Sequence, residues 1–448
     1  MTTKFRSQAR RTGGAAVLAL AMLACNVDTL LDVPDPDVAT PASVQDKSAL
    51  PAVLAAAIGD FMVAYNGTGD SQISLSGLFT DELIWAETFP TRFEVDARSI
   101  QVVNGTTEGV FRNLHRARVS AQRASEAYQR LDPALIAPFA EALNLEAFTY
   151  IFFGENYCNG VPVSTFDPTA GAVHGAPMSN DSMFLKAVTL FDSALTLLGT
   201  NTAAAAVTQR NFAAIGKGRA LMNRNQAAAA ATAVAAVPTA FSYVINHSDN
   251  TGRQNNGLFS LVFEGRRFSV GQLEGGTGMP FRADSLDPRT PSGRGTGALA
   301  FGFDGATALF TQRKHLLRTT TAPVVTGAEA RLIEAEANLR VGGATTWLAT
   351  LNTLRGTAVP ALAALVDPGT AATRENLVFR ERAYWLWLTS HRLGDMRRLV
   401  RQLGRPVNTV YPTGAYFKGG LYGSDVNFPI PFDELNNEKF KECTDRNA

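Results

Sequence analysis

Hydrophobic and polar positions alternate with a helical period over most of the first half of the chain. The clearest run lies between Ser179 and Gly199, where the apolar residues recur every three or four positions: Phe184, Val188, Phe191, Leu195 and Leu198. Residues spaced in this way share one face of an α-helix, and a glycine is a typical C-terminal stop. The pattern therefore predicts an amphipathic helix that buries one face.

Similar periods predict five further helices before residue 245, at 51–65, 108–131, 133–153, 208–223 and 226–237. Asp132 is placed to cap the third of these, and Pro133 suits its first position. The 226–237 helix is almost all alanine, which lets neighbouring helices approach closely. Successive antiparallel pairs of this kind resemble tetratricopeptide units, in which each pair buries its apolar face by stacking on the next.

Residues 246–325 lose the helical period and are rich in Gly, Asn, Thr and Arg, which predicts a long irregular region with a few short strands. Helix returns at Thr326, which forms a capping box with Glu329, and again at 345–355. We therefore expect one mainly α domain over 51–448. Helix pairs would occupy it to about residue 245, and a loop-rich, partly helical portion would cover 246–448.

The N-terminus has the pattern of an export signal. A basic start precedes an apolar run, 14–24, that is too short to span a bilayer, and Cys25 follows it directly. This arrangement resembles a bacterial lipobox, in which the cysteine is acylated and the signal is removed before it. We expect a signal peptide over 1–24, lipid attachment at Cys25 and an extended, proline-bearing lead over 25–50. An ordinary secretory signal is the alternative.

Two cysteines remain after Cys25, namely Cys158 and Cys443. Export implies an oxidising compartment, where two leftover cysteines are more often paired than free. We therefore expect a disulfide between them, which would tie the end of the chain to its N-terminal half. Two buried, inert thiols are the alternative.

Composition excludes several classes of partner. The chain of 448 residues is 46% hydrophobic and 18% charged, with a net charge of +1, so no basic surface for nucleic acid is indicated. Its five histidines are scattered singly without a metal-binding spacing, so neither a metal nor another cofactor is expected. No G-x-S-x-G motif or phosphate-binding loop is present. The carboxylate pairs Asp81–Glu82 and Glu334–Glu336 are explained by helix polarity or capping.

Aromatic side chains are the better candidates for a binding site, because sugar rings stack on flat apolar groups while polar groups orient them. The segment 81–96 places three aromatic side chains and one arginine in an expected loop after a helix: Trp85, Phe89, Phe93 and Arg92. Further candidates lie in the irregular region and the late glycine-rich loop: Phe281, Arg282, Tyr411, Tyr416 and Tyr422. The alternative is that these side chains fill the core.

Several motifs, in order along the chain, resemble those of the SusD/RagB family of outer-membrane nutrient-binding lipoproteins. They are a helix that runs into "GENYCNGVP", the "DPR" loop within 284–290, "RLIEAEANL" (331–339), "RERAYWLWLTSHRLGDMRRL" (380–399) and "FPIPFDELNNEKF" (428–440). The chain departs from the family pattern at Trp387 and Ser390, which replace an acidic residue and a glycine. The resemblance covers nearly the whole mature chain.

This resemblance implies a SusD-like fold and a non-catalytic, surface-exposed lipoprotein of the outer membrane. Such a protein binds a nutrient, usually an oligosaccharide and in some members a peptide, and delivers it to a TonB-dependent, SusC-like transporter. The alternatives are a secreted α-rich glycan-degrading hydrolase and a purely structural scaffold.

The segment 375–399 mixes large apolar side chains with charged ones. On a single helix, Glu381 and Arg392 share a stripe with Trp385, and Asp395 lies close to it. A charge on a buried face has to be paired and hydrogen-bonded. The charges are spread along a helix rather than gathered in a cleft, which favours a structural role over a catalytic one.

Glu381 and Arg392 would lie about 16 Å apart on that helix, which is too far for a mutual ion pair. Each therefore needs a partner on a neighbouring element, such as Arg331 or Glu334. Asp395 is expected to pair locally with an arginine one turn away.

Overall fold

Helices make up most of the regular structure in the part of the chain that the computed structural model describes, residues 46–67, 69–167, 171–282, 287–343 and 345–443. The expected signal peptide (1–24), Cys25 and most of the lead lie outside these residues, as does Asp284. Packing divides the chain into two units, Met1–Ala49 and Leu50–Ala448, and the elements below belong to the second.

The helices of this unit, in chain order, are α3 (Leu50–Asn66), α4 (Gln72–Phe79), α5 (Pro90–Asp96), α6 (Gly105–Leu131), α7 (Ile136–Asn156), α8 (Asn180–Leu198), α9 (Ala204–Asn223), α10 (Ala227–Val234), α11 (Gly257–Phe259), α12 (Gly327–Arg340), α13 (Thr346–Gly356), α14 (Ala371–Trp385) and α15 (Arg392–Arg401). The mainly α fold predicted from the sequence is confirmed.

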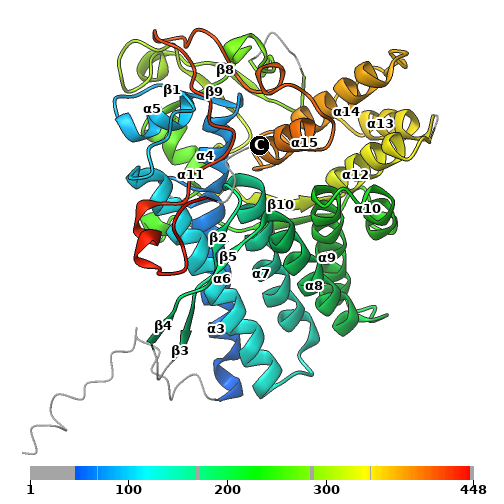
Figure 1. Cartoon of the computed structure of the whole chain (residues 1–448). Helices are drawn as coiled ribbons and strands as arrows, with labels where there is room; N and C mark the ends of the chain where they lie inside the picture. The colour runs from blue at the N-terminus through cyan, green and yellow to red at the C-terminus, as the bar shows by residue number, and fades with distance from the viewer. Residues whose placement is uncertain (1–45, 68, 168–170, 283–286, 344, 444–448) are drawn as a thin grey trace, which may run out of the picture. The chain divides into compact units, whose positions relative to one another are not determined.

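Each long helix of the N-terminal half packs on the next one in the chain. Helix α6 lies between α3 and α7, α8 follows between α7 and α9, and α10 then joins α9 to α12 (Figure 1). The row continues through α12 to α13 and α14. This is the stacking of consecutive helices that the hydrophobic periods predict. It buries one large apolar core, and a smaller second cluster lies between α12, α13 and α14.

Close packing along α9 depends on glycine. A Cβ atom added to Gly218 would lie 2.5 Å from Val234 of α10, and one added to Gly216 would lie 2.2 Å from Phe191 of α8. Because no real Cβ makes such contacts, the three helices could not approach this closely with larger residues there.

Helix α3 begins the stack. The run Lys47–Asn66 is long and apolar enough to cross a membrane by length and composition, and core helices of soluble proteins pass the same test. Phe61 and Tyr65 of α3 are completely buried and stack on Phe152 of α7. We therefore assign α3 to the core.

Short two-stranded sheets connect the loops around the helices. The strands are β1 (Leu83–Trp85), β2 (Val161–Pro162), β3 (Thr165–Asp167), β4 (Gly171–Val173), β5 (Pro177–Met178), β6 (Ser242–Ile245), β7 (Phe268–Val270), β8 (Ser292–Arg294), β9 (Phe310–Gln312) and β10 (Ala322–Thr326). All five pairings are antiparallel: β1 with β7, β2 with β5, β3 with β4, β6 with β10, and β8 with β9.

One predicted helix start is wrong. Asp132 does not cap α7 but terminates α6, where its N–H donates to the carbonyl of Tyr128. Helix α7 begins at Ile136, three residues beyond Pro133, and no side chain caps it. Of the predicted capping box, the N-cap half is present, since the Thr326 hydroxyl accepts from the N–H of Glu329, whereas the Glu329 carboxyl contacts His391 at 2.9 Å instead.

The single helix expected over 375–399 is also wrong. Helix α14 ends at Trp385 and α15 starts at Arg392, because Leu388 and Ser390 between them adopt left-handed backbone with φ of 55° and 60°. No glycine marks this turn in the sequence. The turn is fixed by long-range contacts: the Leu388 N–H donates to Glu82, and the Ser390 carbonyl accepts from Arg219 of α9.

Glu381 and Arg392 are buried in ion pairs, but their partners differ from those expected. Glu381 contacts Arg289 at 2.6 Å and Arg355 at 2.7 Å. Arg392 binds Asp81, which follows α4, through two hydrogen bonds of 2.7 and 2.8 Å.

The expected partners of Glu381 and Arg392 on α12 are engaged elsewhere. Arg331 pairs with Glu334, one turn away, at 3.1 Å, and it also donates to the carbonyls of Val234 and Val237. Arg331 therefore secures α12 to α10 rather than to α14.

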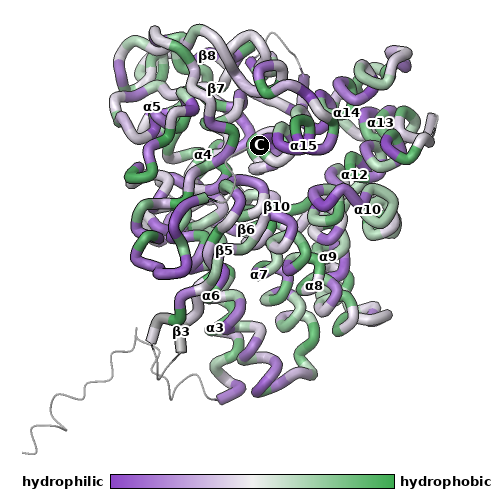
Figure 2. The backbone as a smooth tube through the Cα atoms, in the orientation of Figure 1, coloured by the Kyte–Doolittle hydropathy of each residue, from purple (hydrophilic) through white to green (hydrophobic). Residues whose placement is uncertain are grey.

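A second buried cluster joins α12, α14 and α15. Asp395 accepts from Arg382 at 2.8 and 2.9 Å and from Arg398 at 2.8 Å, so its local pair with an arginine is present. Glu336 contacts Arg398, Arg382 and Arg340 at 2.9, 3.4 and 2.6 Å. Burial alone would raise the pKa of both carboxyl groups, but these guanidinium groups hold each pKa below its ordinary value. Helix α15 is therefore buried despite its hydrophilic sequence (Figure 2).

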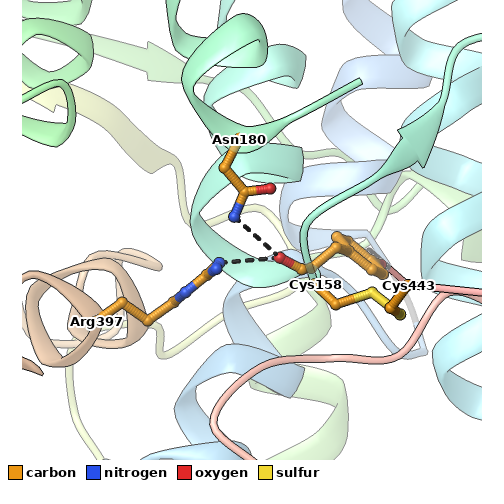
Figure 3. The surroundings of a disulfide bond; sticks show 5 residues. Cys158, Asn180, Arg397 and Cys443 are labelled. Carbon is orange, nitrogen blue, oxygen red and sulfur yellow. Dashed lines mark hydrogen bonds between the residues drawn. A yellow bond between two sulfur atoms is a disulfide. The ribbon is translucent and has the colours of Figure 1, made fainter. Parts of the chain in front are cut away.

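Cys158 and Cys443 form a disulfide, with their Cα atoms 5.9 Å apart (Figure 3). Cys158 follows α7, and its N–H donates to the carbonyl of Phe428, so the C-terminal segment is held by main-chain contacts as well. Beside it, Arg397 and Asn180 both donate to the carbonyl of Tyr157. The bond ties the last described residue to the chain just after α7, within the N-terminal helix stack.

Candidate ligand-binding groove

A hollow of about 730 Å³ lies where three chain segments meet: the end of β1, the turn after Asp304, and the glycine-rich loop at Phe417 and Lys418. We call it the Trp85 groove. It is lined by Ile84, Trp85, Glu87, Thr88, Arg282, Asp304, Ala306, Thr307, Ala308, Phe417 and Lys418. A second hollow of about 520 Å³ shares three of these residues and continues toward Glu274. Each of the two hollows has a volume in the range of small-molecule sites.

Strand pairing places Trp85 in the groove. Trp85 ends β1 opposite Phe268 of β7, and its main-chain N–H donates to the carboxyl of Asp96 at 2.7 Å. Its ring packs against Phe93 with centroids 5.2 Å apart. The indole N–H has no hydrogen-bond partner among the described residues.

One face of Trp85 is covered by a lysine. The Lys418 ammonium lies 3.9 Å from the ring centroid and forms an ion pair of 2.5 Å with Asp304 across the groove. Burial tends to raise the pKa of Asp304, but the Lys418 ammonium and the Thr307 hydroxyl outweigh burial and lower this pKa to about 2. A ligand that stacks on this face has to displace Lys418, which sits just before Gly419 and Gly420 on its loop.

A small aromatic cluster packs behind Trp85. Phe93 contacts Tyr416, and Tyr416 contacts Tyr422, with ring centroids 5.5 and 5.2 Å apart. The Tyr416 hydroxyl donates to Asp96 at 2.7 Å and the Tyr422 hydroxyl to Glu274 at 3.2 Å. Both tyrosines are buried, so they support the groove rather than face solvent.

The other predicted ligand residues divide between groove and core. Arg282 lines both hollows, and its Nε donates to the carbonyl of Val270. Phe89 is 50% exposed beside the groove, while Arg92 pairs with Asp70 and Glu87.

Phe281 and Tyr411 lie in the core rather than in either hollow. Both side chains are completely buried: Phe281 packs on Tyr384 and Trp387, and Tyr411 lies against Phe79. These two rings complete the core, which is the alternative that the sequence left open.

Sequence reasoning missed Phe417, Lys418 and Asp304. Phe417 is 43% exposed and is the most accessible aromatic side chain that lines the groove. Its place in a glycine-rich loop beside Tyr416 was the available signal. Asp304 carries no such signal, because only the folded chain brings it to Lys418.

Burial raises the pKa of Asp96 to about 8, above its ordinary value of 3.8, and this makes a testable prediction. Between pH 4 and pH 8 the folded chain keeps a proton that the unfolded chain releases, so rising pH lowers stability through this group. We expect Asp96→Asn to be more stable than wild type at pH 8, by a few kcal/mol, and to lose that advantage near pH 4. Denaturant unfolding at both pH values measures it.

Asp433→Asn, at an exposed carboxyl, provides the control for the same substitution outside the core. If the stability of Asp96→Asn and that of wild type change in parallel between pH 4 and 8, Asp96 is not protonated in the folded chain.

No family model matches the chain, and no curated protein matches it in sequence. Solved structures do match. A SusD-like protein from Bacteroides fragilis is 13% identical with a TM-score of 0.66, covering 91% of this chain and 98% of its own. Surface glycan-binding protein A from Bacteroides uniformis is 13% identical with a TM-score of 0.65, covering 88% and 99%. A laminarin-binding SusD-like protein is 13% identical with a TM-score of 0.59, covering 89% and 99%.

These similarities extend over nearly the whole length of each solved protein. The chain therefore has the SusD-like fold, as its ordered motifs led us to expect. No group of three or more histidine, cysteine or carboxylate side chains in the described part of the chain is arranged to hold a metal ion.

Proposed function

We propose that this chain is a member of the SusD/RagB family and a non-catalytic glycan-binding lipoprotein. The observation that carries the proposal is the Trp85 groove, in which an indole and an exposed phenylalanine stand among charged side chains in a SusD-like fold. Flat apolar rings with polar neighbours suit the faces and hydroxyl groups of a sugar. Two proteins of similar structure are described as glycan-binding or laminarin-binding.

The expected partner is a TonB-dependent, SusC-like outer-membrane transporter, and the expected anchor is a lipid at Cys25. Binding would capture the nutrient, and closure of this protein on the transporter would hand it over. Purification of the native, full-length protein from outer membranes should bring down a large barrel protein in comparable amount. Recovery of the protein alone, from the soluble periplasmic fraction, would contradict both the anchor and the partner.

A glycan-degrading hydrolase needs two carboxyl groups that flank one sugar bond. Asp304 is ion-paired with Lys418, and Glu87 contacts both Arg92 and Arg267. Glu274 has a raised pKa, caused by burial, but its oxygens accept from the Gln272 N–H and the Tyr422 hydroxyl. This arrangement favours binding without turnover. Purified protein should release no reducing ends from a glycan that it binds.

Removing the aromatic side chains of the groove should weaken glycan binding. We expect Trp85→Ala and Phe417→Ala each to reduce affinity about tenfold, because each removes a stacking surface worth roughly 1–1.5 kcal/mol. Titration calorimetry with laminarin and a panel of other soluble glycans measures the effect. Phe417 is exposed, so its variant should fold normally even if Trp85→Ala is destabilised.

Phe432, which is 53% exposed and does not line the groove, supplies the matched control. Phe432→Ala should bind like wild type. Equal affinity of all three variants would place the glycan elsewhere, and a protein that binds no member of the panel would favour the scaffold alternative.

A further inference from the structure

A separate cavity of about 470 Å³ lies between α6, the segment 162–165 and the segment 431–434. It is lined by Glu108, Phe111, Arg112, His115, Arg116, Arg118, Val119, Ser120, Arg123, Pro162, Ser164, Thr165, Pro431, Asp433 and Glu434. It shares no residue with the Trp85 groove. We call it the α6 cavity.

The walls of the α6 cavity are tied together. The Cys158–Cys443 disulfide joins the chain just before 162–165 to the chain just after 431–434. The Phe432 N–H donates to the carbonyl of Val102, ahead of α6, at 2.9 Å. The Asn437 side chain donates to the carbonyl of Gly175 at 2.8 Å. The cavity is therefore preformed, which lowers the entropic cost of binding.

One wall of the cavity is basic. Four arginines of α6 line it, at positions 112, 116, 118 and 123. Arg112 forms an ion pair with Glu108. Arg116 and Arg123 are exposed and have no ion pair with any residue that the structure describes. Their charges are available to a ligand.

The back of the cavity holds buried nitrogen atoms without partners. Arg118 is 1% exposed; its terminal nitrogens donate to Gln122 at 3.1 Å and to the carbonyl of Ser164 at 2.6 Å. Its Nε has no hydrogen-bond partner among the described residues, and neither does Nε2 of His115. No ion pair joins Arg118 to a described carboxylate, although it interacts electrostatically with Glu146 of α7 at longer range. A buried guanidinium without a carboxylate is costly unless an anion compensates it.

We propose that the α6 cavity is a second ligand site, which binds a single carboxylate of a small ligand. The guanidinium groups of Arg116, Arg118 and Arg123 supply the positive charge and the planar donors that carboxylates prefer. Asp433 and Glu434 line the opposite wall, so a ligand with several negative charges is repelled. The carboxylate belongs to a uronic acid residue of a glycan or to the C-terminus of a short peptide. The proposal does not depend on glycan binding in the Trp85 groove.

Titration calorimetry on the wild-type protein tests the site with two pairs of probes. Each pair compares a carboxylate with its neutral counterpart: a galacturonic acid disaccharide with a galactose disaccharide, and tri-alanine with tri-alanine amide. At least one carboxylate probe should bind tenfold or more tightly than its neutral counterpart. The pair that shows this difference tells whether the natural ligand is a uronic acid or a peptide C-terminus. The proposal fails if neither pair shows a difference.

A double variant locates the binding. Arg116→Gln combined with Arg123→Gln should weaken binding of the carboxylate probe at least tenfold, and both side chains are exposed, so folding should not suffer. Arg130→Gln, at an exposed arginine on the same helix outside the cavity, should leave binding unchanged. Equal loss in the Arg130 control, or no loss in the double variant, would overturn the assignment.

Discussion

Replacing Glu336 with glutamine lowers the free energy of unfolding by about 3–5 kcal/mol. The side chain of Glu336 is 1% exposed and faces three guanidinium groups, those of Arg340, Arg382 and Arg398. Glutamine keeps the size of the side chain but removes its charge. Arg382 and Arg398 then share Asp395, and Arg340 keeps only the neutral partners Asn225 and Gln402, so positive charge in the core loses part of its compensation.

The matched control lies two residues away on the same helix. Glu334 pairs with Arg331, but both side chains are partly exposed, at 16% and 20%. Glu334→Gln should therefore cost no more than about 1 kcal/mol. Denaturant unfolding of the two variants beside wild type measures the contrast. If Glu336→Gln unfolds within 1 kcal/mol of Glu334→Gln, the buried cluster contributes little to stability.

Replacing Cys443 with serine is expected to cost up to about 5 kcal/mol, because the bond to Cys158 closes a loop of 285 residues. Without the bond, the unfolded chain gains the conformational freedom that the loop had removed. In the folded chain, the segment after Phe428 would rely on hydrogen bonds such as that from Cys158 N–H. The expected phenotype is a lower unfolding midpoint together with easier proteolysis of the C-terminal segment.

Reduction separates the covalent effect from the substitution itself. In a reducing buffer, wild type should fall to the stability of Cys443→Ser, and the variant should not respond to the reductant. A wild type that keeps its full advantage under complete reduction would mean that the disulfide is not the source of the difference.

The helical part of the fold was readable from the sequence because its signals are local. Apolar periods gave α3, α6, α8 and α9 to within a few residues, and Thr326 marked the start of α12. Errors arose where tertiary contacts decide. Pro133 suits a helix start, yet α7 begins at Ile136, and nothing local indicates that Leu388 and Ser390 leave the helix.

The need for ion pairs was predictable, but the partners were not. A charge on an apolar helix face has to be compensated wherever the chain places it, and this holds for both Glu381 and Arg392. Asp81 and Arg289 come from segments far away in sequence, so no spacing rule connects them. The same limit explains why Trp85 was recognised as a candidate while its neighbours Asp304 and Lys418 were missed.

The buried ion pairs also bear on how the protein could be recombined with its relatives. Asp81 and Arg219 belong to the N-terminal half of the chain, whereas Arg392 and the Ser390 carbonyl belong to the C-terminal part. A chimaera that crosses over within 246–325 would inherit one member of each contact from each parent. Exchange of halves is therefore tolerated only between parents whose charges correspond at these positions. In evolution, a change of charge at one of these positions in one half requires a matching change in the other half.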